Sequence, residues 1–150
     1  MNMNGTWNGY NNIGICATAL MSVIERTGEL PLAKAMLVMP LVMHDATLAF
    51  LSNASIRKRE AAALTSVRPE LFANFNNRFE DSLVLSLNAV QLLIHLGHMK
   101  LRGNLVPDIP MDISPDFGAR AQRIVKAAPS IAALLASPIE ELYLNFRVHL

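Results

Sequence analysis

The stretch DSLVLSLNAVQLLIHL (Asp81–Leu96) predicts the helix around which the rest of the fold is arranged. Apolar residues recur at helical spacing along two stripes, which are Leu83, Leu87, Val90 and Ile94, and Leu85, Ala89, Leu92 and Leu96. At about 100° per residue, the two stripes lie on nearly opposite sides of the helix. Two polar seams separate them, formed by Asn88, Gln91 and His95, and by Ser82 and Ser86. We therefore expect both apolar sides to be covered. The favoured arrangement places the helix at the centre of its own domain, and the alternative places one side against a partner protein.

A short β-hairpin is expected directly after this helix. Beyond Gly97, apolar and basic residues alternate over 99–102, Gly103 and Asn104 supply a turn, and apolar residues resume at 105–106. The prolines at positions 107 and 110 limit the second strand to a short edge strand. Winged helix-turn-helix domains have this order of helix, helix and hairpin. The sequence therefore predicts a winged-helix-like core.

The N-terminal half predicts a series of further helices. The first runs from about Ile13 to Thr27, with an asparagine before it as a cap and Gly28 after its end. A second helical stretch begins near Pro31, and Pro40 is expected to kink or end it. Shorter helical segments fill the chain between this stretch and the central helix.

The chain is expected to be mainly α and to form one domain. An irregular arm rich in Asn and Gly is expected over 1–12, followed by a single α-rich domain over 13–150. Within this domain the winged-helix-like part spans about 53–110 and a helical tail spans 111–150. The last helix of the tail is expected to start at Ser137-Pro138, because proline is favoured in the first turn of a helix.

The composition indicates a subunit that buries part of its surface in a partner. Apolar residues make up 52% of the 150 residues, and charged residues only 17%, below the usual value of about 25%. Thirteen Lys and Arg against twelve Asp and Glu leave a net charge of +1, which gives no bulk electrostatic argument for nucleic acid. Cys16 is the single cysteine and lies in an apolar run, so it cannot form an intramolecular disulfide.

The sequence predicts a cytoplasmic protein without a membrane segment. The N-terminal residues lack the basic and apolar regions of a signal peptide. Apolar runs such as Ala35–Met43, which a proline interrupts, are far shorter than the ~20 residues that span a bilayer as a helix.

No catalytic, metal or cofactor site is expected. The four histidines lack the spacing of zinc ligands, and no cysteine pair accompanies them. A Ser–His–Asp site assembled in space is left open, but no Gly-x-Ser-x-Gly motif supports it. The acidic pairs Glu80-Asp81 and Glu140-Glu141 lie near predicted helix starts, where negative charge interacts favourably with the helix dipole. We therefore expect that the chain is not an enzyme.

Three groups of basic residues are candidates for weak contacts to nucleic-acid phosphates. They are Arg57, Lys58 and Arg59 before the central helix, Lys100 and Arg102 on the hairpin, and Arg120, Arg123 and Lys126 in the tail. A solvated surface is the favoured interpretation of all three. A DNA-recognition helix carries a polar, basic outer face, and the stretch 83–96 has none.

Several segments along residues 10–148 together resemble one protein family. They are Tyr10–Gly14, Leu30–Leu32, the run Ala35–His44 with its Pro-Leu and His, Arg68–Phe72, Asn77–Phe79, Leu92–Leu105 and Tyr143–Val148. The pattern resembles the middle component of ABC-three-component conflict systems, which include the Lamassu-type defence operons. The resemblance implies a non-catalytic adaptor that bridges an SMC-like or ABC-type ATPase and an effector, commonly a nuclease, and holds the effector inactive until it is triggered. No cofactor is implied, and DNA contact arises only through the complex.

The residues that we expect to contact these partners come from two segments. They are Leu85, Leu92 and Leu96 on one stripe of the central helix, and Leu142 and Phe146 near the C-terminus. One alternative function is a stand-alone winged-helix DNA-binding regulator. Another is a small-molecule sensor whose pocket is lined by phenylalanines and by Met36, Met39 and Met43.

Overall fold

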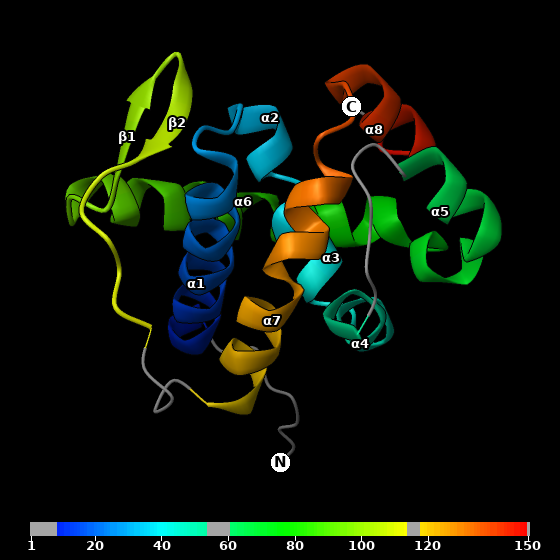
Figure 1. Ribbon diagram of the computed structural model, residues 1–150, viewed down its shortest axis with the longest axis horizontal. Coiled ribbons are helices and arrows are strands. Elements are labelled where there is room, and N and C mark those ends of the chain that lie inside the picture. The colour runs from blue at the N-terminus through cyan, green and yellow to red at the C-terminus, as the bar shows by residue number, and fades with distance from the viewer. Residues whose placement is uncertain (1–8, 54–60, 114–117, 150) are drawn as a thin grey trace.

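The structure is a computed structural model that describes residues 9–53, 61–113 and 118–149. It is mainly helical with one small antiparallel hairpin, which confirms the mainly α class and the hairpin that the sequence predicts (Figure 1). Its elements are α1 (Gly9–Thr27), α2 (Leu32–Ala35), α3 (Val38–Val42), α4 (Asp45–Asn53), α5 (Ala61–Val67), the 3₁₀ turn η1 (Pro69–Phe72), α6 (Phe75–His95), β1 (Met99–Arg102), β2 (Asn104–Pro107), α7 (Ala119–Leu134) and α8 (Ile139–Asn145).

Three long helices form the body of the molecule. α1 and α7 pack side by side, and α6 passes behind them across the width of the molecule (Figure 1). α3 packs between α1 and α6, and α4 packs against α7. One continuous apolar cluster fills the space between these helices, and its largest fully buried side chains include Leu20, Ile24, Leu37, Leu48 and Leu93.

One helix boundary differs from the predicted one, and one predicted break is present. α1 begins at Gly9 rather than at Ile13, so the last residues of the predicted arm over 1–12 are helical, while residues 1–8 lie outside the described part. The helical stretch after Pro31 is interrupted between α2 and α3, one turn before Pro40. This is the position where a proline disrupts a continuous helix, because its ring conflicts with the carbonyl four residues earlier. Pro40 itself lies in the first turn of α3, where its missing N–H would have had no intrahelical acceptor.

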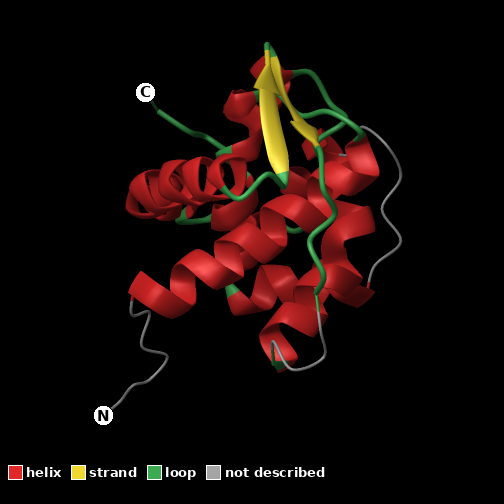
Figure 2. Cartoon of the chain, turned by 90° about the vertical axis from the view of Figure 1, so that its left-hand side faces the viewer, coloured by secondary structure: helices red, strands yellow, loops and turns green. Residues whose placement is uncertain are grey.

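The predicted hairpin is present, with Gly103 at its turn in the left-handed region at φ +74°. Leu101 pairs with Leu105 across the two strands. Leu30, between α1 and α2, adds a third extended position, because it exchanges two backbone hydrogen bonds of 2.9 Å with Leu105. The hairpin lies at one end of the helical body (Figure 2), where Met99 and Leu105 join the apolar core, and among the described residues β1 is left as an open edge.

The elements predicted for a winged-helix-like core over about 53–110 follow one another along the chain in the expected order. In space, however, they do not pack against one another in that order. α5 contacts α8 and η1, whereas α6 contacts α1 and α3. The helix beside α6 is thus contributed by the N-terminal part of the chain. The likeness to a winged helix stays a prediction.

The structure corrects the predicted burial of the central helix. Neither leucine stripe of α6 forms the main buried face. The serine seam between the stripes faces the core instead, as Ser82, Ser86, Ala89, Val90 and Leu93 are buried. The opposite seam, Asn88, Gln91 and His95, is exposed. The two leucine stripes therefore lie on the flanks of the helix.

A polar network anchors the start of α6 to the N-terminal half. The half-buried Arg78 guanidinium donates to the Pro40 carbonyl at 3.1 Å and to the Leu71 carbonyl at 3.0 Å, and it lies 5.3 Å from the centre of the Phe75 ring. Burial lowers the pKa of Arg78. Since both acceptors are backbone carbonyls, the Arg78 cation joins α3 and η1 to α6 through hydrogen bonds to the main chain.

His44 lies beside the same network. The Thr47 hydroxyl donates to the Leu71 carbonyl at 3.1 Å, so it accepts the 2.7 Å hydrogen bond from Nδ1 of His44. Partial burial lowers the pKa of His44, and the Arg78 cation lowers it further, while Asp45 acts in the opposite direction. The folded protein therefore favours the neutral imidazole.

We predict that Arg78→Met lowers the free energy of unfolding by about 2–3 kcal/mol, because it removes charge-assisted hydrogen bonds from two half-buried carbonyls. Urea unfolding followed by circular dichroism measures this change. The control is Arg123→Met on the exposed side of α7, which should change stability by less than about 0.5 kcal/mol. Equal effects of the two substitutions would contradict a structural role for Arg78.

Stability should also fall on mild acidification. A lowered folded-state pKa means that the unfolded state binds the proton of His44 more tightly. The contribution of His44 to the free energy of unfolding is therefore fully present above its unfolded-state pKa of about 6.5. It is lost as the pH falls through the folded-state pKa. His44→Gln should reduce this loss in urea titrations between pH 7.5 and 5, whereas His95→Gln on exposed α6 should preserve it. An unchanged pH profile in His44→Gln would show that another group is responsible.

Candidate functional site

The five residues predicted to contact a partner fall into two classes in the structure. Leu92 and Leu96, on one flank of α6, are 37% and 54% exposed. Leu85, on the same flank, is partly buried and packs against the core. The structure corrects the other two, since Leu142 and Phe146 are fully buried in the chain's own core and present no surface to a partner.

Phe146 is buried because it completes an aromatic cluster. Its ring stacks on Phe72 at 4.9 Å with an interplanar angle of 13°, and it lies 4.9 Å from the ring of Phe75. The neighbouring Tyr143 contacts Phe79 edge-on and donates from its hydroxyl to the Ala33 carbonyl at 2.7 Å. The apolar side of the last helix thus packs onto η1 and α6 and does not form an exposed docking surface.

The structure also exposes apolar residues that were not proposed as contacts. Leu87 and Ile94 lie on the other flank of α6, and Val84, which is 68% exposed, lies among the residues of the exposed polar seam. Ile109 is exposed beside the C-terminal end of α6, where its backbone N–H donates to the Gly97 carbonyl at 3.1 Å. The two apolar stripes of the sequence include the residues of both flanks. The stripes alone, however, do not indicate which of the two seams between them faces the core.

The structure describes five of the eight candidate phosphate-binding residues. Arg57, Lys58 and Arg59 lie outside the described residues. Lys100 on β1 forms an ion pair with Asp108 at 3.4 Å, and Arg102 is exposed near the turn of the hairpin.

Arg120 from the tail has a structural role. Its guanidinium pairs with Asp45 at 2.9 Å and donates to the carbonyls of Val42 and Met43 at 3.2 and 3.3 Å. It thereby fastens α7 across the junction of α3 and α4. Lys126, nearly two turns further along α7, lies 3.4 Å from Oδ1 of Asn53.

The described residues contain no group of three His, Cys, Asp or Glu side chains that could hold a metal ion. Burial raises the pKa of the Cys16 thiol to about 12, so the thiol stays protonated near neutral pH. Nδ1 of His98 lies 2.8 Å from the Ile109 carbonyl. The buried, protonated thiol and the contact of His98 with a backbone carbonyl both indicate structural roles.

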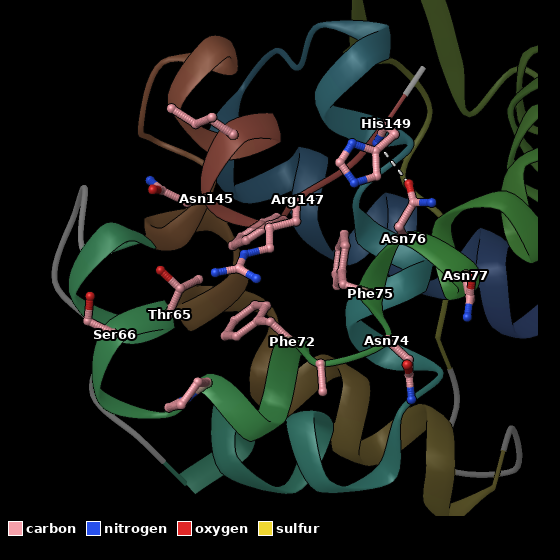
Figure 3. A pocket seen from close by; sticks show the side chains of 14 residues that line it. Thr65, Ser66, Phe72, Asn74, Phe75, Asn76, Asn77, Asn145, Arg147 and His149 are labelled. Carbon is pink, nitrogen blue, oxygen red and sulfur yellow. Dashed lines mark hydrogen bonds between the residues drawn. The ribbon is translucent and has the colours of Figure 1, made fainter.

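The methionines proposed to line a sensor pocket are part of the core. Met36 and Met39 are buried in the apolar cluster, and Met43 packs against it. A hollow of about 800 Å³ lies elsewhere, between α5, η1, the start of α6 and the residues that follow α8 (Figure 3). Its lining is mainly polar, with hydroxyls and asparagines around Phe72 and Arg147.

Within the described ranges, no single helix is long and apolar enough to cross a membrane. The segments Leu32–Val42 and Asp45–Asn53 pass such a test only when taken together, and they are bent by 102° relative to each other.

Comparison with curated proteins and with solved structures yields no match. A family model does match, and it covers residues 7–150, which is nearly the whole chain. The described helices and the hairpin all fall inside this match. The chain therefore belongs to the family described as ABC-three component (ABC-3C) system Middle Component 3.

Proposed function

We propose that the chain is a non-catalytic adaptor, which bridges an SMC/ABC-type ATPase and a nuclease effector in a defence system against phage or plasmid DNA. Membership in a three-component system implies that the other components of the system are its partners. In this role the chain provides binding surfaces for its partners and carries out no catalytic step. DNA is contacted only by the complex.

The observation that carries this proposal is the apolar surface of α6. A helix on the outside of a globular domain usually presents polar residues away from the core. α6 has one exposed polar seam, but both of its flanks carry exposed leucines or isoleucines. Neighbouring exposed apolar side chains of this kind are typical of protein interaction sites.

We propose the flank formed by Leu92, Leu96 and the adjoining Ile109 as the partner surface, and we call it the Leu92 flank. It combines the C-terminal end of α6 with the segment after the hairpin, so its three apolar side chains come from two parts of the chain. Leu85 borders this surface, but its core contacts make it unsuitable for a test of binding alone.

We predict that Leu92→Glu/Leu96→Glu weakens complex formation by at least about 100-fold, because burial of two leucines contributes about 3 kcal/mol or more. The chain is co-expressed with the ATPase and effector encoded beside it, and the complex is purified and its mass measured by light scattering. Circular dichroism should show that the isolated variant remains folded.

The matched control lies on the opposite flank of the same helix. Leu87 and Ile94 are 40% and 38% exposed, so Leu87→Glu/Ile94→Glu introduces the same charge at similar exposure. The control should retain the complex. If the control loses the complex and the first variant keeps it, the partner surface is on the Leu87 side. If the unaltered chain binds neither partner, the adaptor function is wrong, and salt-dependent DNA binding by the chain alone becomes the function to test.

A further inference from the structure

The hollow beside α8 is lined by an exposed arginine, Arg147. Among the described residues, the Arg147 guanidinium forms no hydrogen bond or ion pair. Figure 3 shows it extending over Phe72 on the side of the hollow where Thr65, Ser66 and Asn145 lie. The lining includes no carboxylate, so the positive charge of Arg147 is not neutralised within the hollow.

Arg147 also holds an unfavourable backbone conformation. Its φ is +58°, and it is the only described residue other than glycine with a positive φ. It follows the C-terminal end of α8, where its N–H donates to the Leu144 carbonyl at 3.1 Å and the Val148 N–H donates to the Tyr143 carbonyl at 3.0 Å. This pair of hydrogen bonds is the Schellman motif, in which the residue at the position of Arg147 is usually glycine.

The same chain uses glycine for the same task at the end of α6. Gly97, at φ +84°, donates to the Ile94 carbonyl at 3.1 Å, and the next residue, His98, donates to the Leu93 carbonyl at 2.9 Å. Glycine adopts positive φ without the steric conflict that a Cβ atom causes. The arginine at the end of α8 therefore opposes local stability, and such strain is characteristic of residues that bind ligands.

The remaining lining suits a small anion with an apolar part. Ser66 and the Asn145 amide add hydrogen-bond donors on the same side as the guanidinium, while Phe72 and Leu144 contribute apolar surface. A volume of about 800 Å³ is within the range of small-molecule sites. On the opposite side of the hollow, the backbone N–H of His149 donates to Oδ1 of Asn76 at 2.8 Å.

We propose that this hollow binds a small organic anion, with Arg147 holding its phosphate or carboxylate group and Phe72 contacting its apolar part. This site is independent of the Leu92 flank and of the adaptor function. Arginine suits the role because its planar guanidinium donates two parallel hydrogen bonds to either kind of oxyanion.

The test uses the full chain and isothermal titration calorimetry with four probes: adenosine monophosphate, adenosine, inorganic phosphate and benzoate. We expect saturable binding of adenosine monophosphate or benzoate, each of which joins an oxyanion to a ring, and none of adenosine, because adenosine lacks the oxyanion. Binding of adenosine monophosphate identifies a phosphate site and binding of benzoate a carboxylate site. Inorganic phosphate should bind more weakly than adenosine monophosphate, and equal binding of the two would overturn the role of Phe72. No binding of any anion, or equal binding of adenosine, would overturn the proposal.

The decisive variant is Arg147→Gly, which separates binding from folding. Glycine relieves the positive-φ conformation, so we expect the Tm to rise by about 2–4 °C. The same substitution should weaken anion binding by about 10- to 100-fold, because a charge-assisted interaction is lost. Leu87→Glu/Ile94→Glu, distant from the hollow, should leave anion affinity unchanged. A lower Tm in Arg147→Gly would mean that the arginine stabilises the fold, and unchanged anion affinity would exclude it from the site.

Discussion

The contact between α6 and α1 is the constraint on which the rest of the structure depends. α6 turns a seam of small side chains toward the core, and the helix packs there against α1. Small residues at a helix crossing allow the two backbones to approach closely. Once this seam is buried, the bulky residues on either side must lie on the flanks of α6, and part of them must remain exposed. The apolar surface of the molecule is thus a geometric consequence of how its central helix packs.

The rest of the molecule is built to hold α6 in this position. Arg78 fixes its start to α3 and η1, and the hairpin follows its end and is tied to Leu30. The 21 residues of α6 make it about 30 Å long. Its first turn lines the polar hollow, while its last turns carry the Leu92 flank. One helix therefore runs between the two surfaces to which we assign binding.

Much of the secondary structure was predictable because its signals are local. The turn at Gly103 and the start of α8 after Pro138 each depend on the conformational preferences of one or two residues. Other features depend on distant partners. Leu142 and Phe146 have the spacing of a docking helix, yet they are buried because α8 returns to the phenylalanines of η1 and α6. Arg147 gave no signal at all, since a Schellman motif without glycine is not recognisable from residue types.

The sequence by itself determined the helical class, the hairpin and the family, because periodicity, turn residues and a pattern spread along the chain are all properties of residue order. Only the tertiary structure decided which side of α6 is buried. Two apolar stripes and two polar seams give nearly equivalent orientations of an isolated helix, and the choice between them is made by the shape of α1 and α3 against which α6 packs. The same holds for the hollow beside α8, whose walls come from four segments that are brought together by packing alone.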